Sequence, residues 1–336
     1  MRFRDYHQLP DGLPCGSLNR ITDVAGLTVG HHTVIEDEPR ILRTGVSVLR
    51  IEDVLARPVA AEYAVLNAFG KSIGLIQVEE VGTMQSPVFF ANTLSAGTVD
   101  DGAVRLAIKE KPDLRSYNPV ILECNDSELS DIAAMAVTPE MAEIAYEDAV
   151  EDFPVGSVGA GAGMVCYSFK GGIGSSSRVI EVENKKYTVG AMVLSNYGTR
   201  NDLRIPGLDR SFAVEPREEE SQKGSLIMVV ATDLPLLPHQ LKRVARHAPM
   251  AIGLLGSPGG HGSGDIALAF STTYREGGEG VLQTREVVSE HGPTMTLVFR
   301  AAVWATAEAI LDSLYASPTV KGLRKTVPSI RTVLDS

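Results

Sequence analysis

One apolar run near two thirds of the chain length constrains the fold more than any other stretch. It extends from Ser225 to Ala231, and its length and β-branched residues predict a buried strand. A charged segment, residues 217–223, stops directly before it at Gly224. A hydroxyl is therefore the first side chain of a core strand, and the glycine before it lets another group approach its carbonyl closely.

The order Gly224-Ser225 suits a serine that cleaves its own chain. The hydroxyl can attack the carbonyl carbon of Gly224 and form an ester, which water then hydrolyses. The new chain begins at Ser225, and its free α-amine has a reference pKa of about 7.7–8.0, so it can act as a general base beside its own hydroxyl. The dipeptide by itself also fits an ordinary loop that ends at a strand.

Composition limits the classes of protein to which the chain can belong. With 336 residues, 44% hydrophobic and 22% charged, it can bury a large core in one domain or two. A net charge of −11 argues against a nucleic-acid partner, and no stretch indicates a membrane span. We expect a cytoplasmic protein, because the first residues lack the apolar segment of a secretory signal. The three cysteines are too widely spaced to predict a disulfide framework or a zinc site: Cys15, Cys124 and Cys166.

Strands and helices alternate along the chain. Apolar residues at helical spacing predict helices over residues 57–69, 99–108, 139–150, 235–248 and 297–314. Short apolar runs predict strands over residues 44–51, 72–78, 87–90, 118–123, 179–182, 187–194 and 266–272. Residues 201–223 have no apolar periodicity, so they are predicted to form an exposed connector that is easily cleaved.

The middle of the chain is rich in glycine, in residues 158–164 and 170–178. Neither segment contains a dinucleotide-binding Gly-x-Gly-x-x-Gly in a βαβ context or a Gly-Lys-Ser/Thr sequence, so no cofactor is predicted. Glycines at this density allow close approach of the backbone around a site and leave N–H groups available as donors.

Polar residues follow several of the predicted strands. Asn196 comes after strand 187–194, and its amide could donate to an oxyanion, although stabilisation of a turn fits its position as well. Asn125 lies in the polar turn that follows strand 118–123. Ser263 and Asp265 end a glycine-rich loop, residues 257–265, before the strand that begins at Ile266. Strand ends of this kind often carry function.

Taken together, the ordered motifs resemble those of the L-aminopeptidase D-Ala-esterase/amidase (DmpA-type) family, which includes the β-aminopeptidases. They cover nearly the whole chain: Ile21-Thr-Asp-Val-Ala-Gly, Glu79-Glu80, Asn92-Thr93, Glu123-Cys-Asn-Asp, Val158-Gly-Ala-Gly-Ala-Gly-Met, Lys170-Gly-Gly-Ile-Gly-Ser, Ala231-Thr-Asp-Leu-Pro-Leu and Ser263-Gly-Asp. The resemblance implies that Ser225 is the processed nucleophile, that Ser263 and Asp265 support it, and that Asn196 is the oxyanion residue.

The family also implies further pocket residues, and this chain departs from it at some positions. Asn125, Gly161 and Gly172 match places from which an oxyanion or substrate pocket could be built. Some family members have a tyrosine donor near the position of Asn125, and this chain lacks it. Threonine is usual in the family at two positions that are occupied here by Ala162 and Ser175.

The resemblance implies the fold as well. We expect one α/β (α+β) domain over residues 1–336, a four-layer αββα sandwich similar to N-terminal-nucleophile hydrolases but of different topology. Cleavage would divide it into residues 1–224, the α chain, and residues 225–336, the β chain. Family members form homo-oligomers of such αβ units, so a tetramer or octamer is expected, without a metal or other cofactor.

Three functions are consistent with these motifs. The first is an aminopeptidase that removes an N-terminal residue from small peptides, amides or esters through an acyl-enzyme at Ser225. The second is an acyltransferase like the ornithine acetyltransferases, which use a processed threonine, and the third is a non-catalytic relative that stays uncut. Serine at the nucleophile position favours the aminopeptidase. Of the other common hydrolase motifs, Gly-x-Ser-x-Gly occurs once, as Gly70-Lys-Ser-Ile-Gly74, and His-Glu-x-x-His does not occur.

Overall fold

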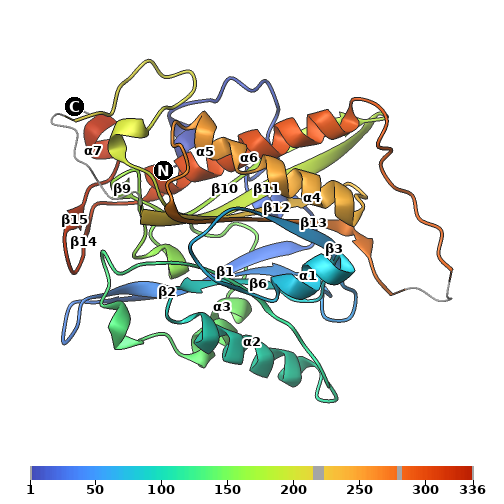
Figure 1. Cartoon of the computed structure of the whole chain (residues 1–336), viewed down its shortest axis with the longest axis horizontal. Helices are drawn as coiled ribbons and strands as arrows, with labels where there is room; N and C mark the ends of the chain where they lie inside the picture. The colour runs from blue at the N-terminus through green and yellow to red at the C-terminus, as the bar shows by residue number, and fades with distance from the viewer. Residues whose placement is uncertain (1, 215–222, 278–281, 335–336) are drawn as a thin grey trace.

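Two β-sheets lie face to face at the centre of the molecule (Figure 1). The computed structural model describes residues 2–214, 223–277 and 282–334, so residues 215–222 of the predicted connector lie outside the described residues. The larger sheet has six strands, in the order β10 (Gly172–Val182), β11 (Lys185–Asn196), β12 (Lys223–Thr232), β13 (Gly262–Arg275), β3 (Val59–Ala68) and β5 (Thr83–Met84). The second sheet has five, in the order β1 (Leu27–Glu36), β2 (Leu42–Ile51), β6 (Val88–Asn92), β7 (Val120–Cys124) and β4 (Ser72–Ile73).

Helices cover the outer face of each sheet (Figure 1). The six-stranded sheet is covered by α4 (Pro238–His247), α5 (Met250–Leu254) and α6 (Thr294–Ala316), and the five-stranded sheet by α2 (Ala96–Glu110) and α3 (Pro139–Glu147). This αββα order confirms the expected α+β architecture. The remaining elements are α1 (Leu75–Val81), α7 (Arg331–Leu334), the hairpins β8 (Val165–Cys166) with β9 (Phe169–Lys170) and β14 (Val320–Lys321) with β15 (Thr326–Val327), and the 3₁₀ helices η1 to η5 (Phe3–Asp5, Ile21–Asp23, Ile132–Ala134, Gly159–Gly161 and Arg200–Asp202).

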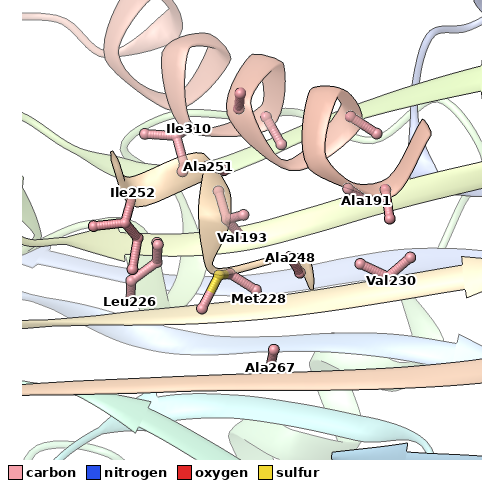
Figure 2. Close-up of a cluster of buried hydrophobic side chains, with 14 of the residues drawn as sticks. Ala191, Val193, Leu226, Met228, Val230, Ala248, Ala251, Ile252, Ala267 and Ile310 are labelled. Carbon is pink, nitrogen blue, oxygen red and sulfur yellow. The ribbon is translucent and has the colours of Figure 1, made fainter. Parts of the chain in front are cut away.

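Strand β12 is buried on both faces, as its apolar run predicts. Leu226, Met228 and Val230 project into the layer beneath the helices, where Figure 2 shows them beside Ile252 and Ile310. The residues between them face the other sheet, because successive side chains of a strand point to opposite faces: Ile227, Val229 and Ala231. Burial of each valine, leucine, isoleucine or methionine side chain contributes about 1.5–3 kcal/mol. Ser225, the third residue of this strand, is therefore held by a rigid core.

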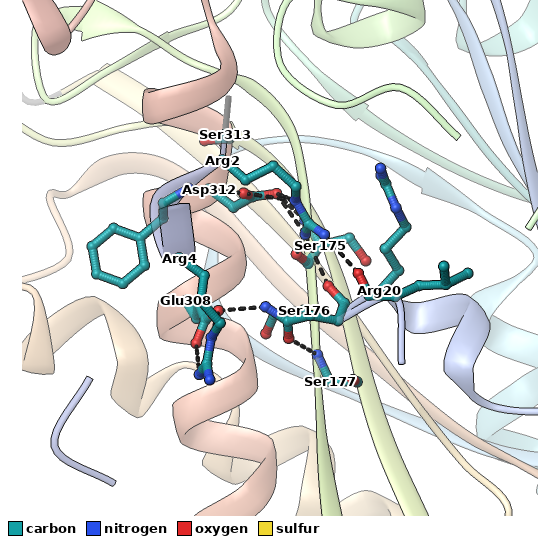
Figure 3. A network of polar contacts seen from close by, with 12 residues as sticks. Arg2, Arg4, Arg20, Ser175, Ser176, Ser177, Glu308, Asp312 and Ser313 are labelled. Atoms are coloured by element: carbon teal, nitrogen blue, oxygen red, sulfur yellow. Dashed lines mark hydrogen bonds and ion pairs between the residues drawn. The ribbon is translucent and has the colours of Figure 1, made fainter. Parts of the chain in front are cut away.

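Ion pairs to two buried carboxylates of α6 hold the N-terminal segment against this helix (Figure 3). Arg2 pairs with Asp312 at 3.0 Å and Arg4 with Glu308 at 2.7 Å, and Glu308 also pairs with the wholly buried Arg178 of β10 at 2.7 Å. By length and composition α6 could cross a membrane, but 61% of its most apolar stretch is buried inside the protein. The ion pairs of its acidic residues with β10 and with the N-terminal segment are typical of a helix packed in a protein core.

Two of the predicted elements are wrong. Residues 57–69 do not form a helix but strand β3, which pairs antiparallel with β13. Its alanines carry little periodic signal, and in the structure they alternate, with Ala60 under the helices and Ala61 between the sheets. Residues 72–78 are divided between β4 and α1 by Gly74, whose φ of +83° ends the strand.

Candidate active site

Ser225 lies at the start of β12, between two neighbouring strands. In the register of the sheet it is directly opposite Asn196 of β11 on one side and Gly264 of β13 on the other. The side chain is 6% exposed, and its Oγ donates a hydrogen bond of 2.7 Å to the carbonyl oxygen of Gly224. The hydroxyl thus lies against the peptide group that precedes it in the chain.

Gly224 is required by the space around it. A Cβ at this position would lie 2.6 Å from the carbonyl oxygen of Asn196 and 2.8 Å from the Cα of Tyr197. Real Cβ atoms do not approach backbone this closely, so any side chain would push β11 away from β12 beside the nucleophile. The absence of a side chain at Gly224 therefore allows β11 to pack directly against β12 beside Ser225.

The side chain of Asn196 is held at both ends of its amide. Its Oδ1 accepts a hydrogen bond of 2.8 Å from the N–H of Val165, and its Nδ2 donates one of 2.9 Å to the carbonyl oxygen of Asn125. The Val165 N–H can only donate, so it fixes which end of the amide is oxygen. Because an amide nitrogen carries two hydrogens, one Nδ2 hydrogen remains for a ligand.

A cavity of about 1020 Å³ opens beside these residues. Ser225, Gly224, Asn196 and Asn125 all line it, and so does Glu123. The structure thus brings together four residues that the sequence analysis selected, from three separate segments of the chain. A nucleophile and an amide donor facing one cavity can act on a carbonyl group.

Glu123 begins the motif Glu123-Cys-Asn-Asp, and the sequence predicts no role for it. Its side chain is 3% exposed, and its carboxylate accepts a 2.8 Å hydrogen bond from the N–H of Lys71 and a further one from the hydroxyl of Thr93. Among the described residues, no cation forms an ion pair with it. The next residue, Cys124, places its sulfur 3.5 Å from the carbonyl oxygen of Ser225. A buried carboxylate that forms no ion pair among the described residues, this near the nucleophile, suits a ligand ammonium group.

The sequence does contain one sign of Glu123. It is the only charged residue in the run Val-Ile-Leu-Glu-Cys, residues 120–124, which forms the buried strand β7. Charged residues are rarely buried unless they are paired, so a carboxylate in such a strand indicates a site. The two groups that donate hydrogen bonds to Glu123, the Lys71 N–H and the Thr93 hydroxyl, are uncharged, so they do not neutralise its carboxylate.

Ser263 and Asp265 form a second polar pair near Gly224. The Ser263 hydroxyl donates to Asp265 Oδ1 at 2.7 Å, and Asn67 donates to Oδ2 at 3.0 Å. Burial raises the pKa of Asp265, and the two donors oppose that rise. Both residues lie within β13, not in a loop before it.

The register of the sheet places this pair on the opposite face from the Ser225 side chain. Ser263 is opposite Gly224, and Asp265 is opposite Leu226, whose side chain points toward the helices. A small cavity of about 10 Å³ is lined by both Gly224 and Ser263. The pair therefore adjoins the backbone on the N-terminal side of Ser225, and it does not line the large cavity.

Gly161 and Gly172 do not line the large cavity, in contrast to their predicted role. They pack against each other, because a Cβ on Gly161 would lie 2.9 Å from the Cα of Gly172. Their N–H groups are engaged as well, by the carbonyl of Val158 at 2.8 Å and the hydroxyl of Ser195 at 3.4 Å. Neither glycine can supply a free oxyanion donor here.

Comparison with known proteins shows to which family the chain belongs. The model of Peptidase family S58 matches residues 19–327. The β-peptidyl aminopeptidase BapA of Sphingosinicella xenopeptidilytica is 37% identical, over 96% of this chain and 86% of the relative.

Solved structures are similar over almost their full length. A β-aminopeptidase from a Burkholderia species has a TM-score of 0.91 and 33% identity, and the match covers 100% of this chain and 98% of that one. The L-aminopeptidase D-Ala-esterase/amidase of Ochrobactrum anthropi, described as a variant of the Ntn hydrolase fold, has a TM-score of 0.89 and 34% identity, with 99% and 98% covered. The chain therefore belongs to peptidase family S58, the serine-type peptide-bond hydrolases that resemble the DmpA enzyme.

Proposed function

We propose that this protein is an aminopeptidase that first cuts its own Gly224–Ser225 bond. The observation that carries the proposal is the Ser225 hydroxyl, held 2.7 Å from the Gly224 carbonyl oxygen at the end of a buried strand. Attack of Oγ on the Gly224 carbon forms a C–O bond while the C–N bond breaks, and the serine nitrogen takes the proton as it becomes an amine. Water hydrolyses the resulting ester, which gives residues 1–224 and residues 225–336.

The same serine would then act on substrates. Its new α-amine accepts the hydroxyl proton as Oγ attacks the substrate carbonyl, and the amine leaving group receives that proton. The free Nδ2 hydrogen of Asn196 stabilises the oxyanion from the strand directly opposite. Water then releases the acyl group from Ser225.

Glu123 supports a preference for substrates with a free N-terminal amine. The substrate ammonium would replace the missing cation beside this buried carboxylate, while its carbonyl lies between Ser225 and Asn196. The names of the relatives support β-amino acids as one class of acyl group. Intact-mass spectrometry combined with a panel of L-, D- and β-aminoacyl p-nitroanilides tests the proposal. A sample that hydrolyses these substrates and contains only the full chain would contradict it.

Glu123→Gln is expected to weaken substrate binding. Glutamine keeps the size of the side chain and an acceptor for the Lys71 N–H, but it has no charge to offer an ammonium. A hydrogen bond to a charged group contributes about 1.5–3 kcal/mol, so KM should rise roughly tenfold to 150-fold. Steady-state kinetics with an aminoacyl ester and its hydroxyacyl analogue measure this effect. If KM rises as much for the hydroxyacyl analogue as for the aminoacyl ester, Glu123 does not bind the amine.

Ser263→Ala is expected to slow turnover without loss of the fold. If the Ser263–Asp265 pair orients the new α-amine of Ser225, its loss should lower kcat by the factor typical of acid–base groups, about 10²–10⁴. Ser257→Ala is the matched control, because Ser257 lines the same small cavity. Its hydroxyl accepts a hydrogen bond from the N–H of Gly259 instead of donating to Asp265. Measurements of Tm and kcat on the same sample distinguish a role in turnover from a role in stability. A Ser263→Ala protein with a lower Tm and a normal kcat would show that the Ser263–Asp265 pair only stabilises the structure.

A further inference from the structure

Lys170 lies behind the oxyanion residue in a wholly buried position. Among the described residues, no carboxylate forms an ion pair with it. Its Nζ donates instead to three main-chain carbonyl oxygens, those of Gly161 at 2.9 Å, Met164 at 2.9 Å and Gly171 at 2.7 Å. An ammonium group carries three hydrogens, so each of them has an acceptor.

Packing alone does not account for a lysine at this position. Removal of a cation from water is unfavourable, and burial lowers the pKa of Lys170 to about 7. The three carbonyl dipoles favour the protonated form, since only that form has a hydrogen for each oxygen. A methionine would fill similar space without a buried charge. The ammonium must therefore be explained by what its hydrogen bonds hold.

One of these bonds leads directly to Asn196. The carbonyl of Met164 and the N–H of Val165 belong to the same planar peptide group, and they point in opposite directions. Lys170 binds the carbonyl end, and the N–H end donates to Asn196 Oδ1 at 2.8 Å. Because the group is rigid, a bond that fixes one end also fixes the other. The N–H of Gly171 donates to the same Met164 carbonyl at 3.0 Å, which restrains it further.

The charge of Lys170 also acts along this path. A cation at the carbonyl oxygen of a peptide polarises the group and makes its N–H a stronger donor, and hydrogen bonds in a chain strengthen one another. The Val165 N–H in turn polarises the amide of Asn196, whose Nδ2 hydrogens then become better donors. The positive charge of Lys170, which does not line the cavity, thus influences the oxyanion through this chain of hydrogen bonds.

We propose that Lys170 is a positioning residue for the oxyanion site. Its ammonium group fixes and polarises the Met164–Val165 peptide, and through that peptide it orients Asn196 and strengthens it as a donor. The carbonyl of Asn125 holds the other end of the amide. This inference rests on the proposed role of Asn196 in turnover.

Lys170→Met tests the inference in the full-length protein. Methionine has no donors, so the Met164 carbonyl keeps only the hydrogen bond from the Gly171 N–H, and the Met164–Val165 peptide holds Asn196 less firmly. A misplaced group in an active site costs up to about a hundredfold, and we expect such a fall in kcat. KM should change by less than about twofold, because Glu123 and the cavity are unaltered.

A double-mutant cycle separates this role from a general effect on the fold. If Lys170 acts through Asn196, adding Lys170→Met to Asn196→Ala lowers kcat no further than Asn196→Ala alone. If Lys170 only stabilises the structure, the two effects on kcat multiply, and the inference is wrong. Should Lys170→Met give no folded protein, Lys170→Gln takes its place in the same cycle, since glutamine also cannot reach all three carbonyls.

Ser317→Ala is the matched control. The Ser317 hydroxyl donates to the carbonyl of Gly171 at 2.9 Å, one of the three oxygens that Lys170 binds, but not to the peptide that holds Asn196. We expect a lower Tm and an unchanged kcat. A normal kcat for Lys170→Met beside an impaired Asn196→Ala would overturn this inference alone, whereas a normal kcat for Asn196→Ala would overturn the proposed role of Asn196 itself.

Discussion

Ser225→Ala is expected to remain one uncut chain of 336 residues that hydrolyses no aminoacyl p-nitroanilide. The variant has no hydroxyl to attack the Gly224 carbonyl, and without cleavage no α-amine is formed at residue 225. Both the nucleophile and its proposed base are therefore lost through one substitution. Intact-mass spectrometry measures the first effect, and the rate of p-nitroaniline release per folded molecule measures the second.

Ser225→Thr is the control for this prediction, because threonine keeps a hydroxyl at the same position. Gly264, directly opposite, has no side chain that would crowd the added methyl group. We expect a slower protein that is still cut and active. A Ser225→Ala sample cleaved at the same bond would show that another protease makes the cut, and one with normal turnover would remove Ser225 from the mechanism.

The fold was predictable where an element is a short apolar run between turn residues. Strand β12 is such a run, and its two apolar faces form the cores on both sides of the sheet. The pattern of residues 57–69 wrongly predicts a helix where the chain forms β3, because alanine has a high helix propensity and is also small enough to fit between closely packed layers. Its strand structure comes from pairing with β13, more than 190 residues further along the chain, and no local pattern contains that information.

The site was predictable only in part, for a related reason. Ser225 and Asn196 occupy strand ends, which a sequence marks clearly, and the register of the sheet places them opposite each other. The contacts of Lys170 are with main-chain carbonyl oxygens, and every residue has one, so no pattern of side chains indicates them. The separation of Ser263 and Asp265 from the Ser225 hydroxyl likewise depends on register, where a shift of one residue changes the face.

Asn196→Ala is expected to lower kcat by roughly 10²–10³, the loss typical of one oxyanion donor, which is about 2.7–4 kcal/mol. KM should change little, because the amide acts where charge develops during the reaction. Cleavage of the Gly224–Ser225 bond passes through an oxyanion too, so the precursor should persist for longer. Single-turnover kinetics and the time course of cleavage, followed on a denaturing gel, measure the two effects.

Asn196→Asp distinguishes a donor from a structural contact. Aspartate keeps an oxygen for the Val165 N–H, so it retains one of the two hydrogen bonds that alanine loses. If the amide only held the surrounding segments together, the aspartate variant would be more active than Asn196→Ala. A donor to an oxyanion predicts the reverse order, because a carboxylate offers no hydrogen and repels the negative charge that forms on the substrate. Turnover of Asn196→Asp at or below that of Asn196→Ala, with an equal or higher Tm, is the result that the proposed mechanism requires.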